Sequence, residues 1–177
     1  MNTEILINLD ASYHVPHVRQ NGVSDFIEDK IREVLGKEKL SEKNIGDIWL
    51  DEKTPINIKS IDVEKAFHMP NLLSVKKCYD FLKDGANNLL FIFVEYKRAG
   101  EYIHIEKIEI KKIEELTGLV VQAQGEGVIQ LKKGKNRTYR EAVDREVFLN
   151  ELRQMINDFI CKQMNKWYNR LEYYEIM

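Results

Sequence analysis

The sequence predicts a fold of α/β or α+β class, in which a mixed central β-sheet is flanked by helices. A chain of 177 residues with 44% hydrophobic residues suits one globular domain. Segments with helical periodicity alternate with strand-like segments along the chain. The run NNLLFIFVEYKR is apolar over most of its length, as a buried central strand is. Because no repeat or low-complexity linker divides the chain, we assign residues 1–177 to one domain.

The first half of the chain predicts a helix followed by two neighbouring strands. We expect the helix over residues 24–35, because apolar residues recur there at helical spacing between a serine and a glycine that suit its two ends. The segment GDIWLDEKTPINIKS then alternates between apolar and polar residues on both sides of a turn at DEKTP. This pattern places Asp47 on one strand, and Asn57 and Lys59 on a single face of the other.

The second half predicts strands between two helices. Pro70 begins a helix that runs to about Asp84. The central strand follows, and EYIHIEKIEIKKI alternates as a half-exposed strand does. GLVVQAQGEGVIQLKK is a further strand, or a pair of strands interrupted at its glycines. A long helix is expected from Tyr139 to about Tyr174.

Composition and charge narrow the classes of protein. No apolar run approaches the roughly 20 residues that span a bilayer, and the N-terminus is acidic where a signal peptide is basic. We therefore expect a soluble, cytoplasmic protein with no membrane association. Cys78 and Cys161 lack a CxxC pattern, which favours two reduced, buried thiols. The net charge of −2 excludes a general nucleic-acid coat, whereas the basic run KKGKNRTYR suits a DNA contact on one face.

Asp47, Asn57 and Lys59 form a pattern related to metal-dependent phosphodiester hydrolysis. Hard cations such as Mg²⁺ bind oxygen ligands, often one or two carboxylates together with a substrate phosphate. A lysine beside the metal can orient or deprotonate the attacking water. An acid on one strand and an acid-x-lysine on its neighbour bring these groups around one cleft. By chance the same pattern occurs in many α/β proteins, as ordinary solvent-facing strand residues.

The blocks SDFIEDKIREVLGKE, GDIWL and INIKS, in this order, resemble the HincII-type restriction endonucleases, a branch of the PD-(D/E)xK nuclease superfamily. The resemblance runs from residue 24 to the C-terminus and implies a restriction-endonuclease-like fold. It also implies a set of catalytic positions. These are the first metal-binding aspartate Asp47, Asn57 in the place of the second acidic ligand, the Ile58 carbonyl as a backbone metal ligand, the catalytic lysine Lys59, and Glu28 from the first helix. As an alternative, Glu28 forms an ordinary i, i+4 ion pair with Arg32.

Further blocks are similar to the DNA-contacting segments of that family. KSIDVEKAFHMPNLLSVKK resembles the segment that enters the DNA, which implies that His68 inserts into the base stack and that Asn71 contacts base edges. Alternatively, His68 is a plain loop residue and Asn71 caps the helix beginning at Pro70. GKNRTYREAV is similar to the recognition loop, where Asn136 would read a base. The other expected DNA contacts lie on the basic run, at Lys133, Lys135, Arg137, Tyr139 and Arg140.

The resemblance implies a magnesium-dependent type II site-specific deoxyribonuclease of a restriction-modification system, acting as a homodimer on double-stranded DNA. Asn57 departs from the family pattern, because its amide lacks the charge that binds magnesium. The chain is also shorter than the family members, so the DNA sequence recognised does not carry over. Two alternatives stay open: another PD-(D/E)xK nuclease that repairs DNA or resolves junctions, and a sequence-specific DNA-binding protein without catalysis.

Two groups of side chains outside these blocks have simpler interpretations. His14 and His17 have a spacing that could suit a metal pair, but with no further ligand nearby we interpret them as loop residues. The aromatic residues near the C-terminus are interpreted as packing or dimer surface rather than a platform for stacking bases; they are Trp167, Tyr168, Tyr173 and Tyr174.

Overall fold

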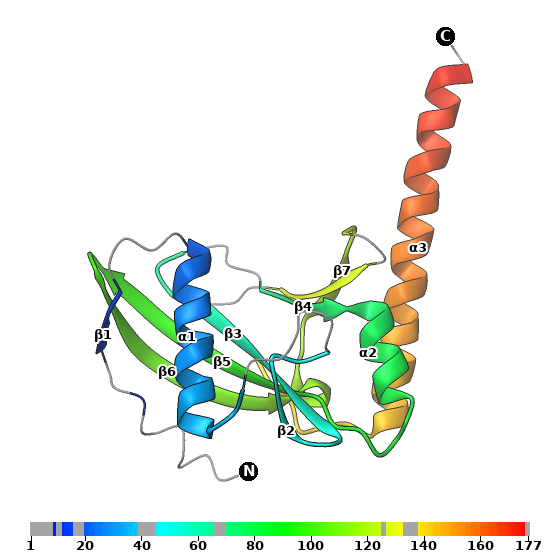
Figure 1. Cartoon of the computed structure of the whole chain (residues 1–177). Coiled ribbons are helices and arrows are strands. Elements are labelled where there is room, and N and C mark those ends of the chain that lie inside the picture. The colour runs from blue at the N-terminus through cyan, green and yellow to red at the C-terminus, as the bar shows by residue number, and fades with distance from the viewer. Residues whose placement is uncertain are drawn as a thin grey trace.

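The structure is a computed structural model, and it describes residues 9, 12–15, 20–38, 45–65, 70–124, 127–132 and 138–175. Helices and strands follow one another along the chain in the mixed order that the sequence predicts (Figure 1). The elements are β1 Ser12–His14, α1 Gln20–Leu35, β2 Ile48–Asp51, β3 Thr54–Asp62, β4 Asn71–Ser74, α2 Val75–Leu82, β5 Leu90–Ala99, β6 Tyr102–Lys112, the short 3-10 helix η2 Ile113–Glu115, β7 Leu119–Gln122, β8 Val128–Leu131 and α3 Arg145–Glu175.

The main sheet has five strands in the order β1-β6-β5-β3-β2. β3 and β5 are parallel, whereas the other neighbours are antiparallel. The predicted mixed sheet with flanking helices is therefore confirmed. β2 and β3 form the predicted hairpin, and β5 lies in the interior of the sheet, as its apolar sequence predicts.

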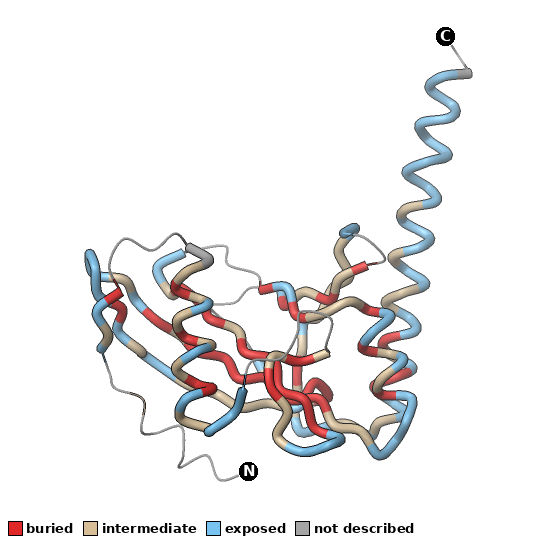
Figure 2. The backbone as a smooth tube through the Cα atoms, in the orientation of Figure 1, coloured by how far each residue is buried: buried red, intermediate tan, exposed pale blue. Residues whose placement is uncertain are grey.

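β3 and β5 send alternate side chains to two separate cores. Ile56 and Ile58 of β3 pack on the side of α1, against Ile27 and Ile31. Phe91 and Phe93 of β5 lie in the other core, with α2 and the first half of α3. Side chains on a strand alternate between faces, so Asn57 and Lys59 point away from the face that α1 covers. Figure 2 shows the buried residues concentrated along these central strands.

A second sheet of three strands, β4-β8-β7, corrects the prediction of a helix beginning at Pro70. Residues 71–74 instead form β4, which pairs with β8. The helix α2 starts only after Ser74, whose side chain accepts a hydrogen bond from the Lys77 N–H as an N-cap. Asn71 is therefore a strand residue, and the alternative in which it caps a helix is wrong.

α3 begins at Arg145, later than the predicted Tyr139. Tyr139 forms an isolated β-bridge with Leu116 instead, and the Asp144 side chain accepts a hydrogen bond from the Glu146 N–H at the start of the helix. The Arg145 guanidinium contacts the buried Glu114 carboxylate, with 2.6 Å between Nε and Oε1. This ion pair fixes the base of α3 to η2.

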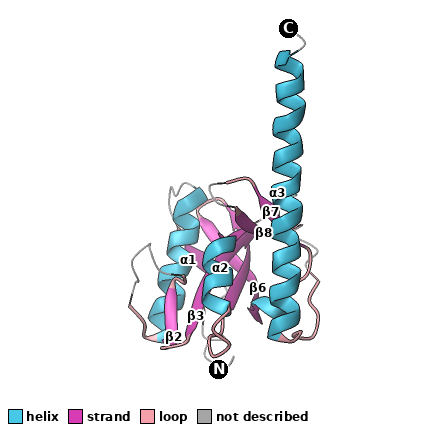
Figure 3. Ribbon diagram, turned by 90° about the vertical axis from the view of Figure 1, so that its right-hand side faces the viewer, coloured by secondary structure: helices cyan, strands magenta, loops and turns pink. Residues whose placement is uncertain are grey.

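The second half of α3 extends beyond the rest of the molecule (Figures 1 and 3). Cys161 lies there and is exposed, so the expectation of two buried thiols is correct only for Cys78. Burial raises the pKa of the Cys78 thiol. His14 also differs from expectation, because it lies in β1 and pairs with Tyr102; His17 is outside the described residues. Within the described segments, no helix has the length and apolar character needed to cross a membrane.

Candidate active site

The β2–β3 hairpin positions Asp47 beside β3. The Asp47 N–H donates to the Ile56 carbonyl at 2.8 Å, which continues the strand pairing by one residue. The Asp47 carboxylate then accepts a hydrogen bond from the Ile58 N–H, with 2.6 Å between Oδ2 and the nitrogen. Asp47 is thus held on the edge of β3 at the point where β2 begins. The sequence predicted Asp47 on the first strand of the hairpin, whereas it directly precedes that strand.

Gly46 makes this close approach possible. A Cβ at that position would lie 2.8 Å from the Pro55 Cβ and 2.9 Å from the Ile56 carbonyl oxygen. Both distances are shorter than van der Waals contact, and one of the atoms belongs to the backbone. A glycine is therefore required for β3 to pass this close to the residue that precedes Asp47.

Asn57 is buried, and its side chain has a structural contact. Its Nδ2 donates a hydrogen bond to the Ile45 carbonyl at 2.9 Å. This bond ties β3 to the segment that precedes β2. An aspartate at position 57 has no hydrogen to donate to that carbonyl, so the amide is not an inert substitute for a carboxylate here.

Lys59 and Glu28 complete the cluster. Lys59 lies two residues beyond Asn57 on the same face of β3 and is half-buried. Glu28 of α1 has its pKa raised, first by burial and then by the negative charge of Asp47, while Lys59 and Arg32 act in the opposite direction. The structure therefore brings Glu28, Asp47 and Lys59 within electrostatic reach of one another.

α1 is fixed on the sheet by two sets of contacts. The hydroxyls of Ser24 and Ser60 are hydrogen-bonded at 2.7 Å, one helical turn before Glu28. The buried Arg32 guanidinium donates to the Glu28 carboxylate at 2.9 Å and also pairs with Asp29. The predicted i, i+4 ion pair is thus present, and Glu28 takes part in it while it also senses the charge of Asp47. Sequence patterns did not reveal the Ser24–Ser60 contact, since it joins two distant segments.

The cluster offers oxygen donors that suit a hard cation. Two carboxylates, Glu28 and Asp47, repel each other, and a cation near both would offset this repulsion. The side-chain oxygen of Asn57 and the Ile58 carbonyl add neutral donors on the same segment of β3. Among the described residues, three or more His, Cys, Asp or Glu side chains do not gather at a possible metal site. Two carboxylates with neutral oxygens nearby are compatible with Mg²⁺, which often uses one or two protein carboxylates and keeps several waters.

Comparison with known proteins supports the fold. Neither a protein-family model nor a curated protein sequence matches the chain. Among solved structures, the NlaIV restriction endonuclease is similar with a TM-score of 0.61 and 13% sequence identity, over 86% of this chain and 76% of that chain.

The chain has a restriction-endonuclease-like fold. At 13% identity the similarity concerns the fold alone, and the narrower resemblance to HincII-type enzymes stays a prediction.

The predicted DNA-reading residues are only partly described. Asn71 is exposed on β4, and its amide lies between two glutamines: Nδ2 donates to Gln124 Oε1 at 3.1 Å and Oδ1 accepts from Gln130 Nε2 at 3.0 Å. Five further residues expected to contact DNA lie outside the described residues: His68, Lys133, Lys135, Asn136 and Arg137.

Tyr139 and Arg140 have protein partners in this restriction-endonuclease-like fold. The Tyr139 hydroxyl donates to the Glu109 carboxylate at 2.8 Å, and the Lys111 ammonium lies 4.8 Å from the centre of its ring. The Arg140 guanidinium donates two hydrogen bonds to the Glu151 carboxylate, and this lowers the pKa of the Glu151 carboxyl. A phosphate contact by Arg140 must therefore compete with Glu151.

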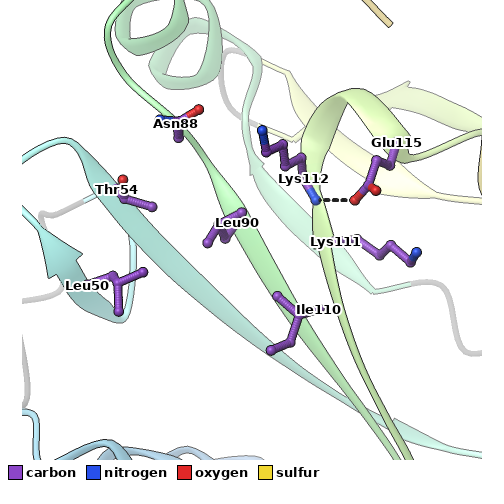
Figure 4. A pocket seen from close by; sticks show the side chains of 8 residues that line it. All are labelled: Leu50, Thr54, Asn88, Leu90, Ile110, Lys111, Lys112 and Glu115. Atoms are coloured by element: carbon purple, nitrogen blue, oxygen red, sulfur yellow. Dashed lines mark hydrogen bonds between the residues drawn. The ribbon is translucent and has the colours of Figure 1, made fainter. Parts of the chain in front are cut away.

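A separate pocket of about 360 Å³ lies near the turn of the β2–β3 hairpin (Figure 4). One wall includes the Lys112 N–H, which donates to the Glu115 carboxylate at 2.7 Å. The pocket contains none of the four predicted catalytic residues. Its lining residues are Leu50, Thr54, Asn88, Leu90, Ile110, Lys111, Lys112 and Glu115.

Proposed function

We propose that this chain is a type II site-specific deoxyribonuclease that cleaves double-stranded DNA by magnesium-dependent phosphodiester hydrolysis. The observation that carries the proposal is the position of Asp47. Its carboxylate is held by the Ile58 N–H on the strand that carries Asn57 and Lys59, within electrostatic reach of Glu28. A shared fold alone does not specify activity, so the proposal of phosphodiester hydrolysis depends on this arrangement of charged side chains.

In this mechanism the protein groups bind the cation, orient the attacking water and balance the charge on the phosphate. Bound Mg²⁺ supplies Lewis acidity and a more acidic water. Asp47, the Asn57 side-chain oxygen and the Ile58 carbonyl would hold the cation, and the Glu28 carboxylate would support the site. The Lys59 ammonium orients the attacking water and stabilises negative charge on the phosphate. Arg32 and Ser24 keep Glu28 in place by fixing α1 on the sheet.

Asn57 lowers the activity expected of this chain. A neutral amide oxygen binds Mg²⁺ more weakly than a carboxylate, so a site with Asn57 retains the fold and DNA binding while cleavage is reduced. Replacing Asn57 by aspartate restores the second acidic ligand.

Two subunits related by a two-fold axis, each cutting one strand, match a palindromic duplex site, as expected for a cytoplasmic restriction-modification enzyme.

A second candidate is a sequence-specific DNA-binding protein without catalysis. The hydrogen bond from Asn57 to the Ile45 carbonyl favours it, because this bond gives the amide a structural role that an aspartate cannot fill. A PD-(D/E)xK repair or junction-resolving nuclease has the same candidate cluster and differs in its substrate.

Incubation with supercoiled plasmid and Mg²⁺ tests the proposal. We compare the natural chain, Asn57→Asp, and Asn57→Asp combined with Lys59→Ala. Cleavage at discrete sites by Asn57→Asp, lost in the Lys59→Ala background, supports a restriction nuclease. Random nicking or junction cutting favours the other nucleases. Specific binding with no cleavage by either Lys59-containing protein under any divalent cation rejects the enzyme.

A further inference from the structure

The second half of α3 carries large apolar side chains that no described part of the chain covers. Residues of its first half, such as Phe148 and Leu152, are fully buried against the body. From residue 160 onward nearly every described residue of the helix is exposed, as its projecting half in Figure 2 shows. The large apolar side chains there are 46% to 72% exposed: Ile160, Met164, Trp167, Tyr168, Leu171, Tyr173 and Tyr174.

These side chains form a stripe with a defined spacing. Successive members are separated by four, three, four and three residues, which is the heptad spacing of a helix that packs against another helix. The members of this stripe, which we name the α3 stripe, are Ile160, Met164, Trp167, Leu171 and Tyr174. The opposite side of the helix carries the exposed polar residues Lys162, Asn165 and Asn169, with Tyr173 as a large aromatic residue among them, so the continuous apolar row lies on the stripe side.

The α3 stripe is large enough to form an interface. At 150–250 Å² for each buried aromatic side chain, the exposed parts of Trp167 and Tyr174 amount to roughly 270 Å² per chain. Ile160, Met164 and Leu171 add to this area, since each is about half exposed. A standard protein interface covers roughly 800 Å² per partner, and apolar patches above a few hundred Å² mark interaction sites. The surface thus approaches what a small helix-pair dimer needs.

The charges beside the α3 stripe are compatible with a second copy of the same helix. Gln163 and Arg170 border one edge, whereas Cys161 and Tyr168 border the other. Of these four residues Arg170 alone is charged, and its guanidinium lies over its own Trp167 ring, 5.3 Å from the centroid. Glu175, seven residues after Tyr168, is of the opposite charge. Two identical helices can therefore approach without placing rows of like charge against each other.

We propose that the α3 stripe is a dimerisation surface that pairs with the α3 stripe of a second copy of this chain. Because the heptad positions of one helix form the holes that receive the knobs of an identical helix, the pattern is self-complementary. The inference rests on α3 alone and stands whether or not the chain cleaves DNA. It assigns a place on the fold to the dimer that the proposed function requires.

Sedimentation equilibrium of the full-length chain, without DNA or divalent cation, tests the proposal. The matched variants are Trp167→Ala/Leu171→Ala on the stripe and Asn165→Ala/Asn169→Ala on the opposite side. All four positions are exposed, and alanine favours the helix, so both variants keep the fold. Far-UV circular dichroism checks that the helix content of each variant is unchanged.

We expect the natural chain to sediment at twice its mass of 20.9 kDa at micromolar concentration. The stripe variant should raise the dissociation constant at least about tenfold, and the opposite-side variant should leave it unchanged. A natural chain that is monomeric at these concentrations overturns the proposal, since the stripe then has another partner or none. A dimer that both variants leave intact also overturns it, because another surface then makes the dimer.

Discussion

The side-chain amide of Asn57 donates a hydrogen bond to the main-chain carbonyl of Ile45, with 2.9 Å between Nδ2 and the oxygen. This contact joins the proposed catalytic strand to the segment that leads into Asp47. Position 57 therefore has two competing requirements. An amide satisfies the neighbouring carbonyl, whereas a carboxylate satisfies a bound cation.

Asn57→Asp should lower the stability of the cation-free protein and strengthen its binding of Mg²⁺. In the presence of a chelator, a carboxylate oxygen faces the Ile45 carbonyl without a hydrogen between them, and we expect the free energy of unfolding to fall by about 1–3 kcal/mol. Mg²⁺ should then raise the melting temperature of Asn57→Asp more than that of the natural chain. Thermal denaturation with and without Mg²⁺ measures both effects. Equal shifts in the two proteins would contradict a cation site at position 57.

Asp47→Ala should lower both the stability of the protein and its cleavage of DNA. The hydrogen bond from the Ile58 N–H to a charged acceptor disappears, which is expected to cost about 1.5–3 kcal/mol in urea denaturation. Asp47→Asn keeps an acceptor oxygen and should cost less. In the Asn57→Asp background, both variants should abolish plasmid cleavage. If Asp47→Asn still cleaves the plasmid, the negative charge of Asp47 is not needed for catalysis.

Gly46→Ala should displace the strand that carries Asp47. The added Cβ meets Pro55 and the Ile56 carbonyl below 3 Å, so the backbone must shift, and we expect a loss of about 1–3 kcal/mol in urea denaturation. Gly85→Ala is the matched control, because a Cβ there has nothing within 4 Å. If the two variants were equally stable, the close packing at Gly46 would be wrong.

The raised pKa of Glu28 predicts that cation binding depends on pH. Burial and the charge of Asp47 raise its pKa, so the carboxyl stays protonated at a higher pH than an ordinary glutamate. Cation binding needs the carboxylate and should weaken as the pH falls through this raised pKa. Calorimetric titration of Asn57→Asp with Mg²⁺ at several pH values measures the profile. Glu28→Gln should flatten it, whereas Glu33→Gln, on an exposed site of the same helix, should not.

Arg145 and Glu114 should behave as a coupled buried pair. Arg145→Met leaves the Glu114 carboxylate buried without its partner, and we expect a loss of about 3–5 kcal/mol. The double variant Glu114→Gln/Arg145→Met should recover much of this loss. Asp80→Asn, in an exposed ion pair with Lys76, serves as a control and should change the denaturation midpoint little. A double variant no more stable than the single one would show that the two groups are not coupled.

Local patterns in the sequence predicted the hairpin that carries the candidate residues, whose roles stay predictions. Asn57 and Lys59 lie on β3 and Asp47 directly precedes β2, and period-two alternation is enough to predict that these segments are neighbours. The helical spacing of α1 likewise identified Glu28 as a residue that could reach the strands. The Ser24–Ser60 hydrogen bond escaped detection, because it joins a helix to a strand that is far away in the sequence.

Errors arose where distant segments determine local structure. Residues 71–74 are a strand because β8 pairs with them, and nothing near Pro70 in the sequence reveals that partner. Tyr139 is bridged to Leu116 for the same reason, which delays the start of α3. Cys161 was expected to be buried as a thiol without a disulfide or metal partner, yet it is exposed on α3, whose second half extends beyond the body of the molecule.

The parallel pairing of β3 with β5 has a consequence for how the protein folds. The β2–β3 hairpin is local and can form from neighbouring residues, whereas β3 can join β5 only when the two ends of the connection 63–89 are brought together. The entropy of closing that long connection must be overcome before the parallel contacts stabilise the sheet. Asp47 and Ile58 can therefore meet early, while the buried surroundings of Asn57 are completed late, when the crossover closes.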